Sequence, residues 1–223
     1  DLHVGGRSHG GILEHTAQEC GTLVLGQLSN NCYIWADEKT KDAMVVDAPD
    51  KADEIIAFAR DKGLKITDIV LTHGHFDHIL ALKELKEKTG ATLSVFEKTA
   101  DFMRDPVRNL AQYMNIEIPP TKPDRLLKDG DEIDFRGNKI KVLHTPGHTE
   151  DSICLLSGKT LLSGDTLFRL SVGRWDHPTG NMIEEIKSIN DKLMPLPDDT
   201  EVYPGHGPST AIGEERKGNP YIK

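Results

Sequence analysis

Short apolar runs separated by polar turns fill the chain between residues 22 and 46. Turn residues such as Ser29 interrupt the runs, and this alternation is typical of β-strands. The predicted strands cover 23–28, 32–36 and 43–46. Apolar residues then recur at helical spacing over 52–59, which predicts a helix that Asp50 caps and Gly63 ends.

The same patterns continue through the rest of the chain and predict an α/β protein. A buried strand over 66–71 leads through a polar loop into a helix over 79–89, which Gly90 ends. Further strands are expected over 132–135, 139–144, 152–156, 159–162 and 201–203, and a further helix over 183–193. Four prolines exclude a long element from the segment 101–124, which is either a flap near the site or a surface excursion.

The composition is that of one folded unit. Hydrophobic residues make up 37% and charged residues 28% of the 223 residues, which is enough apolar material for a sizeable core. No low-complexity linker interrupts residues 21–223, which we expect to form a single domain. Residues 1–20 are rich in Gly and His without periodicity, and we expect them to be an extension, either trimmed or added.

The formal net charge of −9 restricts the partners of the protein. A negative field repels phosphate backbones, so no nucleic-acid partner is expected. No apolar run approaches the roughly 20 residues that cross a bilayer, and the N-terminus lacks the pattern of a signal peptide. We therefore expect a cytoplasmic protein that acts on a small molecule and does not bind a membrane. Its oligomeric state does not follow from these residues.

Four potential metal ligands follow the predicted strand over 66–71 within one short segment. They are His73, His75, Asp77 and His78. Burying such polar groups without a partner costs several kcal/mol each, whereas a divalent cation compensates for their burial. Gly74 permits the tight backbone turn that lets the side chains converge. The segment therefore predicts a metal site.

Three further candidates lie just after other predicted strands, where loops leave a sheet. They are His148, Asp165 and His206. A glycine directly precedes each of them, and a glycine lets the backbone turn a ligand inward. One such residue alone is more often an ordinary polar side chain, but the repeated pattern indicates that all three join the same site.

The motifs around these residues resemble those of the metallo-β-lactamase superfamily. The resemblance extends from about residue 22 to 222 and is carried by HxHxDH at 73–78, TPGHT at 145–149, SGDTLF at 163–168 and PGHGP at 204–208. Within it, the loop over 164–180 is similar to that of the glyoxalase II-like branch. The resemblance implies the metallo-β-lactamase fold, a four-layer αβ/βα sandwich.

The resemblance also implies two divalent metal ions. The implied ligands are His73, His75 and His148 for one ion, Asp77, His78 and His206 for the other, and Asp165 as a bridge. Asp77 is also expected to be catalytic, by passing a proton. Zinc is the first expectation for the metal, with iron or manganese as alternatives. Asp47, after the strand over 43–46, either orients a ligand or merely forms a turn.

In the family, a metal-bridging hydroxide attacks an acyl carbon, so the expected activity is that of a binuclear metallohydrolase acting on a thioester. The chain resembles a hydroxyacylglutathione hydrolase in a short form, without the C-terminal helical segment that binds glutathione in glyoxalase II. Phe168, Arg174 and Trp175 are expected to line the substrate mouth. For Arg174 a solvated charge, and for Trp175 simple packing, are equal alternatives.

Other activities fit similar motifs. One alternative is a persulfide dioxygenase, which uses a single iron held by two His and one Asp. Another is a phosphodiesterase or RNA-processing nuclease, against which the acidic charge argues. β-Lactamase activity is less favoured, because true β-lactamases of the commonest subclass carry Arg where this chain has His78.

Overall fold

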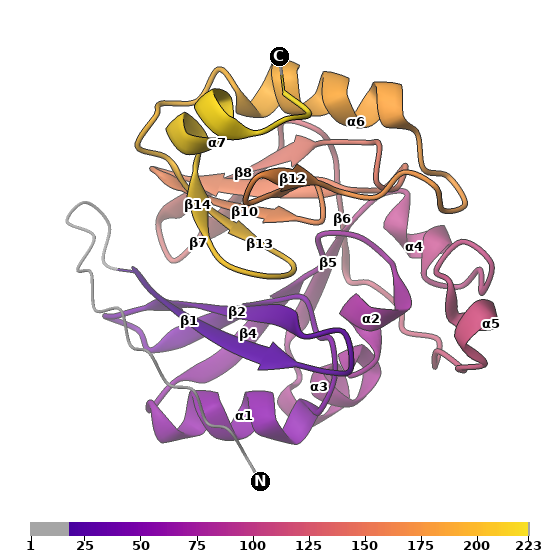
Figure 1. Cartoon of the computed structure of the whole chain (residues 1–223). Coiled ribbons are helices and arrows are strands. Elements are labelled where there is room, and N and C mark those ends of the chain that lie inside the picture. Colours follow the sequence, from indigo (N-terminus) through magenta and orange to yellow (C-terminus); the bar gives the residue numbers. More distant parts are fainter. Residues whose placement is uncertain (1–17, 223) are drawn as a thin grey trace, which may run out of the picture.

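Two six-stranded sheets lie face to face in the computed structural model, which describes residues 18–222 (Figure 1). The first sheet consists, in spatial order, of β1 (Gln18–Leu25), β2 (Asn30–Asp37), β3 (Asp42–Val46), β4 (Lys65–Val70), β5 (Thr92–Phe96) and β6 (Arg125–Leu127). The second consists of β14 (Thr210–Ala211), β13 (Glu201–Pro204), β10 (Thr160–Gly164), β9 (Ile153–Ser157), β8 (Asn138–His144) and β7 (Glu132–Phe135). A separate ribbon pairs β11 (Leu167–Phe168) with β12 (Ser171–Val172).

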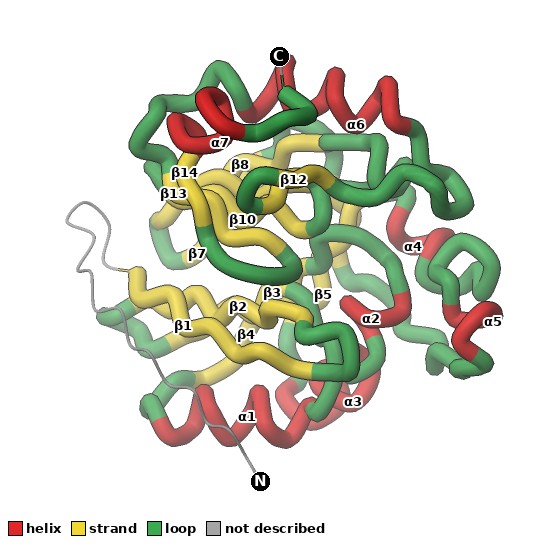
Figure 2. The backbone as a smooth tube through the Cα atoms, in the orientation of Figure 1, coloured by secondary structure: helices red, strands yellow, loops and turns green. Residues whose placement is uncertain are grey.

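Helices cover the outer face of each sheet, so the layers follow the order helix, sheet, sheet, helix (Figure 2). The first sheet is covered by α1 (Ala52–Asp61) and α3 (Leu82–Thr89), and the second by α6 (Met182–Ser188), the π-helical turn Ile189–Leu193 and α7 (Ile212–Gly218). The short helices α2 (Phe76–Ile79), α4 (Thr99–Phe102) and α5 (Ala111–Met114) lie in the connections after β4 and β5. This arrangement confirms the predicted four-layer αβ/βα sandwich.

The inner strands are apolar because both of their faces are buried. Successive residues of a strand point to opposite faces of a sheet. Along β2, Ile34 and Ala36 pack in the cluster that includes Ile55 of α1, whereas Tyr33 and Trp35 pack in the cluster between the two sheets. Burial on both faces explains why the sequence shows continuous apolar runs here instead of a strict alternation.

Several predicted boundaries are wrong. The strand expected over 23–28 is β1, which ends at Leu25. The extension does not reach residue 20, because Gln18 pairs with Asp37 in β1–β2 and the first sheet begins there; residues 1–17 lie outside the described part. Asp50 does not cap α1: the N-cap residue is Lys51, whose own N–H donates to Asp50 Oδ1 at 2.8 Å. The helix predicted over 79–89 is two helices, α2 and α3.

The proline-rich segment over 101–124 packs beside the predicted metal-binding loop. The N–H of Phe76 in this loop donates to the Asn109 carbonyl at 2.8 Å. The ring centroid of Phe102 lies 5.8 Å from that of His75. Of the two alternatives for this segment, a position near the site is therefore the one that the structure supports. Among the helices of residues 18–222, none has the length and apolar character needed to cross a membrane.

Candidate metal centre

The seven predicted ligands meet between the two sheets, at one end of both. Four of them follow β4, and the others follow β8, β10 and β13: His73, His75, Asp77 and His78, then His148, Asp165 and His206. β10 and β13 are parallel, so their carboxyl ends lie at the same edge. Asn31 N donates to the Gly205 carbonyl at 2.7 Å and ties the first sheet to the second at this edge.

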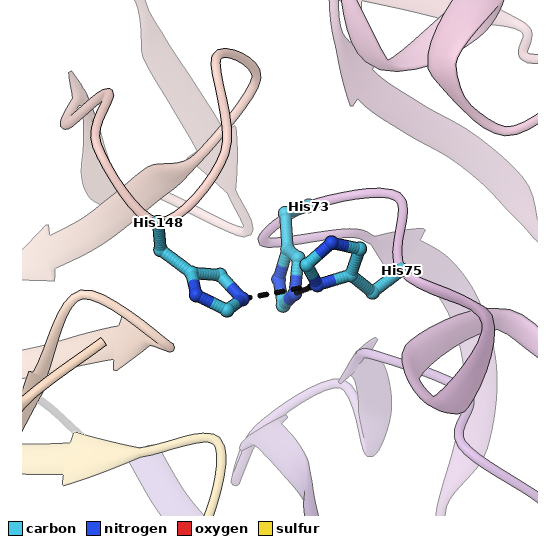
Figure 3. A group of neighbouring side chains, drawn as sticks. All are labelled: His73, His75 and His148. Carbon is cyan, nitrogen blue, oxygen red and sulfur yellow. Dashed lines mark hydrogen bonds between the residues drawn. The ribbon is translucent and has the colours of Figure 1, made fainter. Parts of the chain in front are cut away.

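The first group of ligands is formed by three buried histidines, His73, His75 and His148 (Figure 3). His75 Nδ1 lies 3.2 Å from His73 Nε2 and 3.0 Å from His148 Nε2. Around a tetrahedral zinc with Zn–N bonds of about 2.0–2.1 Å, ligand nitrogens lie about 3.3 Å apart. The three imidazoles therefore have nearly the spacing of a preformed metal site.

The second group is formed by Asp77, His78 and His206. Asp77 Oδ2 lies 3.6 Å from His78 Nε2 and 3.4 Å from His206 Nε2. The side chain of His78 is fully buried, but that of His206 is 26% exposed and that of Asp77 is 12% exposed. Solvent therefore reaches the site from the side of Asp77 and His206.

Asp165 faces both groups. Its Oδ1 lies 3.5 Å from His78 Nε2 in the second group, and its Oδ2 lies 3.7 Å from His148 Nε2 in the first. A carboxylate has two oxygens that can accept separately, whereas an imidazole offers one lone pair. The placement of Asp165 is the one that a bridging ligand requires.

Unsatisfied polar atoms inside the site fit a cation. Asp165 Oδ1 and His78 Nε2 are buried and have no hydrogen-bond partner among residues 18–222. Leaving such groups unpaired costs free energy, and a divalent ion between them would remove that cost. A third group, His73, His78 and Asp165, overlaps the other two, and two ions held by imidazole and carboxylate groups match this donor set.

The protonation of the site also fits a cation. Burial opposes a charge on His206, but the carboxylates of Asp165 and Asp77 outweigh it and raise the pKa of His206 to about 10. The carboxylates thus attract positive charge. Burial, together with the other imidazoles, lowers the pKa of His73 and His75 well below the ordinary value. Both rings are therefore neutral, as metal ligation requires.

Four of the histidines are oriented by a contact to the ring nitrogen that faces away from the site. The contacts are His73 Nδ1 to Thr72 Oγ1 (3.1 Å), His78 Nδ1 to Asp47 Oδ2 (2.8 Å), His148 Nδ1 to the Arg174 carbonyl (2.7 Å) and His206 Nδ1 to the Leu28 carbonyl (3.0 Å). A proton held at Nδ1 by an oxygen leaves the Nε2 lone pair for a metal.

Asp47 connects the end of β3 to two parts of the metal-binding loop. It accepts hydrogen bonds from Thr72 N at 2.8 Å and Thr72 Oγ1 at 2.7 Å, in addition to its contact with His78. Its backbone has φ of 62°, a left-handed conformation that Asp tolerates better than most residues. Of the two alternatives for Asp47, the structure supports the one in which it orients a ligand.

The three predicted substrate residues lie in different settings. The ring of Phe168 lies 6.3 Å from that of His206, beside the exposed side of the site. Arg174 contacts the site through its carbonyl, while its guanidinium forms an exposed ion pair with Asp176 at 2.9 Å. Trp175 packs on Tyr221, with ring centroids 6.0 Å apart. Phe168 is thus the one of the three whose side chain lies beside a ligand.

Two residues without any motif also reach the site. Asn30 is buried, and its Nδ2 donates to Asp77 Oδ2 at 2.8 Å. The half-buried ring of His177 lies 5.6 Å from that of His75 and 6.1 Å from that of His148. Asn30 lies in a predicted turn and His177 in a loop without periodicity, so no pattern in the sequence marks either residue.

A third residue, Glu185 on α6, is fully buried and lies behind His148. Its Oε2 accepts a hydrogen bond from His148 N at 2.6 Å. Burial raises the pKa of Glu185 to about 9. Adjacent glutamates near the start of a helix normally indicate a solvated face that favours the helix dipole, so the sequence gives no signal for this burial.

Known proteins with sequences similar to this chain include two bacterial relatives. An uncharacterized protein of Aquifex aeolicus is 38% identical over 202 residues, which cover 89% of this chain and 94% of that protein. The hydroxyacylglutathione hydrolase GloC of Haemophilus influenzae is 34% identical over 197 residues, which cover 86% of this chain and 92% of that protein.

Solved structures and a family model agree with these relatives. The BLEG-1 B3 metallo-beta-lactamase superposes with a TM-score of 0.87 at 32% identity, over 92% of this chain and 100% of that one. TTHA1623 in a di-iron-bound form superposes with a TM-score of 0.80 at 31% identity, over 91% and 100%. The family model of the metallo-beta-lactamase superfamily matches residues 25–206, a range that includes all seven predicted ligands. The chain therefore belongs to the metallo-β-lactamase superfamily.

Proposed function

We propose that this protein hydrolyses small acyl thioesters with two divalent metal ions held by the seven residues of the site. The observation that carries the proposal is the position of Asp165, whose two oxygens lie 3.5 Å from His78 Nε2 and 3.7 Å from His148 Nε2. One carboxylate can thus serve both groups of ligands. Paired ions about 3.5–4 Å apart are typical of hydrolytic metal sites.

Some residues of the site would bind the metal ions, and one, Asp77, would also transfer a proton. When bound, the two ions supply a hydroxide nucleophile at neutral pH, because they lower the pKa of water from 15.7 to about 7. The buried rings of His73, His75 and His148 close the inner side of the site against bulk water. Asp77 lies on the exposed side, where a substrate enters, and we assign the transfer of a proton to it.

The charge state of Asp77 favours a thioester over a substrate with a poor leaving group. Burial opposes ionisation of Asp77, but His78 and His206 outweigh it and hold its pKa well below the ordinary value. Asp77 is therefore ionised at neutral pH and accepts a proton instead of donating one. A thiolate, with a pKa near 8.5, leaves without help from a strong acid, whereas an alkoxide does not.

The relatives support the same class of substrate. GloC of Haemophilus influenzae, 34% identical to this chain, is named a hydroxyacylglutathione hydrolase, and its named substrate is a thioester. The proposal does not extend to glutathione itself. The guanidinium of Arg174, which was expected to meet a substrate, forms an exposed ion pair with Asp176, so this basic side chain does not indicate recognition of the glutathione carboxylates.

Hydrolysis of β-lactams is the second candidate, and the similarity to the BLEG-1 B3 metallo-beta-lactamase favours it. A β-lactam also carries a carbonyl that hydroxide can attack. Its leaving group is an amine, which needs a proton as the bond breaks. A thiolate needs no such proton, so this activity ranks below thioester hydrolysis.

A substrate panel tests the proposal. The zinc-, iron- or manganese-loaded protein is assayed with a small acyl thioester, a β-lactam, a lactone and a phosphodiester at equal concentration. We expect the highest kcat/KM for the thioester. We also expect Asp77→Ala to lower kcat by at least about 100-fold, the loss typical of a proton-transfer group. The matched control is Asp134→Ala, which removes an exposed carboxylate on β7 that pairs with Lys139.

Two results would overturn the proposal. One is a thioester rate no greater than the buffer rate while the β-lactam or the phosphodiester is cleaved. The other is full thioester turnover in the Asp77→Ala variant, since the proposed site then plays no part in the reaction.

A further inference from the structure

Glu185 is a buried acidic residue that the proposed chemistry does not use. It lies on α6, the helix that covers the second sheet, and its relative exposure is 0%. Its neighbour Glu184 is exposed, so α6 directs the second of two adjacent glutamates into the protein. Burying a carboxyl group is costly unless its oxygens meet hydrogen-bond donors, so the contacts of Glu185 indicate why it is there.

The first contact holds the backbone of a metal ligand. Glu185 Oε2 accepts a hydrogen bond from the N–H of His148 at 2.6 Å. Gly147, the preceding residue, packs so closely on α6 that a Cβ atom there would lie 2.2 Å from Glu185 Cα and 2.3 Å from Glu185 Oε2. The Gly147 carbonyl also accepts from Asn181 N, directly before α6, at 2.7 Å. The turn that carries His148 is therefore fixed to the start of this helix.

The second contact is with the segment that orients the same ligand's ring. His148 Nδ1 lies 2.7 Å from the Arg174 carbonyl, and Gly173 directly precedes Arg174. A Cβ atom at Gly173 would lie 2.8 Å from Glu185 Oε1 and 2.9 Å from His148 Cβ. The Asp165 carbonyl oxygen would lie closer still, at 2.0 Å, so Gly173 lies in a narrow space enclosed by Asp165, the Glu185 carboxyl group and His148. The carboxyl group thus holds the ligand's backbone through Oε2 and leaves no space for a side chain at Gly173, while Oε1 has no hydrogen-bond partner among residues 18–222.

We infer that Glu185 is a positioning residue for the metal ligand His148. Through Oε2 it holds the His148 backbone, and its carboxyl group packs next to Gly173, which directly precedes the residue whose carbonyl fixes the imidazole. The affinity of His73, His75 and His148 for a metal ion therefore depends on a side chain of α6 that is not itself a ligand. This inference rests on the metal-binding part of the proposed function and is independent of the substrate.

Metal affinity of substituted proteins tests the inference without any measurement of hydrolysis. Glu185→Leu fills a similar volume but removes both oxygens. Glu185→Gln keeps an oxygen that can accept from His148 N, and Glu184→Leu is the matched control on the exposed face of α6. Each protein is stripped of metal and titrated with zinc against a chromogenic chelator. The thermal unfolding of each metal-free protein is recorded in parallel.

The expected result is a selective loss at one of two zinc sites. Residues that orient a ligand typically contribute about 10–100-fold to metal affinity. We expect a loss of this size for one zinc ion in Glu185→Leu, and affinities within about threefold of the parent for Glu185→Gln and Glu184→Leu. If Glu185→Leu does not fold, Glu185→Asp replaces it, because the shorter side chain withdraws the oxygens from His148 N while keeping the carboxyl group.

Two results would overturn the inference. The first is a Glu185→Leu or Glu185→Asp protein that binds both zinc ions as tightly as the parent. The second is an equal loss at both sites that follows the loss of thermal stability in every variant, which is the behaviour of a residue that only packs. A protein that binds two zinc ions normally but cleaves no thioester would refute the proposed substrate and leave the role of Glu185 intact.

Discussion

Asp47 Oδ2 lies 2.8 Å from His78 Nδ1, and the same carboxylate accepts hydrogen bonds from the N–H and the hydroxyl of Thr72. Asp47 stands at the end of β3, whereas Thr72 and His78 lie on either side of the other ligands of the metal-binding loop. One side chain therefore fixes both ends of the loop. It also requires His78 to carry its proton at Nδ1, which leaves Nε2 for a metal.

Replacing Asp47 by Asn is expected to weaken metal binding by the second group of ligands, which includes His78. Asn tolerates the left-handed backbone of residue 47, so the loop keeps its path. An amide offers one oxygen, which cannot serve both Thr72 N and His78 Nδ1. If the amide nitrogen faces His78, the imidazole must accept at Nδ1 and carry its proton at Nε2, the wrong tautomer for binding. We expect about a 10–100-fold loss of affinity for one metal ion in calorimetric titrations.

The control for this prediction is Asp50→Asn, a change of the same chemistry three positions away whose carboxylate accepts from Lys51 N and touches no ligand. Asp50→Asn should bind metal as the parent does. Equal metal binding by the parent and the Asp47→Asn protein would show that His78 does not need this carboxylate.

The ligands could be predicted from the sequence because each is linked to a local signal. His148, Asp165 and His206 each follow a glycine at the end of an apolar strand, and the strands fix where those ends lie. In a parallel arrangement such as β10 and β13, the carboxyl ends of strands share an edge. The layers could be predicted for the same reason. A continuous apolar run indicates a strand that is buried on both faces, and helical spacing of apolar residues indicates a helix that packs with one face on a sheet.

The residues that support the ligands could not be predicted, because their burial depends on contacts between distant segments. Glu185 is buried only because Gly147 and Gly173, which lie on two other loops, leave room for its carboxyl group. Asn30 starts β2, and Asp77, 47 residues later, follows β4 of the same sheet, so only the fold brings the two together. The wrong prediction that Asp50 caps α1 is a related case. The Asp50 carboxylate accepts a hydrogen bond from the N–H of Lys51 instead of from an N–H within the helix, and the sequence spacing fits either hydrogen bond equally well.

Stability of the metal-free protein is expected to depend on pH through Glu185. Burial raises the pKa of Glu185 from its ordinary 4.5 to about 9. Between these values the unfolded chain has lost the proton that the folded protein keeps, so the free energy of unfolding falls as pH rises from 4.5 towards 9. The amide of Glu185→Gln does not titrate, so this variant does not lose stability in this way as the pH rises. We compare the melting temperature of Glu185→Gln minus that of the parent at the two pH values. This difference should be at least about 3 °C higher at pH 8 than at pH 5.

Differential scanning calorimetry of both proteins after chelation measures this effect, because every other titrating group is common to the two. A difference in melting temperature that stays constant from pH 5 to pH 8 would contradict a raised pKa for Glu185.

Removal and return of metal should reveal two ions per chain. Metal binds the folded protein in preference to the unfolded one, so saturation should stabilise the fold by about 2.7 kcal/mol when free metal is at 100 times its dissociation constant. We expect chelation to abolish thioester hydrolysis and lower the melting temperature, and added zinc, iron or manganese to reverse both. Elemental analysis of the reloaded protein should give two ions. Saturation by one iron ion, with oxygen uptake on a persulfide, would identify the dioxygenase instead.

His177 is expected to contact the substrate. Its ring lies 5.6 Å from that of His75 and 6.1 Å from that of His148, it is half-buried while both of those rings are buried, and it has no hydrogen-bond partner among residues 18–222. Burial lowers its pKa, so at neutral pH it presents one N–H donor and one acceptor. A polar group placed between the ligands and solvent, and left unpaired, is available to a bound acyl thioester.

Substitution of His177 separates substrate binding from metal binding. One hydrogen bond contributes about 1 kcal/mol, so His177→Phe should raise the KM for the thioester about fivefold, with two metal ions still bound and kcat within about threefold of the parent. His177→Asn keeps a donor near the same place and should lie between the two proteins. An unchanged KM in His177→Phe would show that the substrate does not meet this ring. A loss of metal would instead show that His177 supports His75 and His148 through its ring nitrogens, since Phe keeps the ring contact but cannot donate or accept.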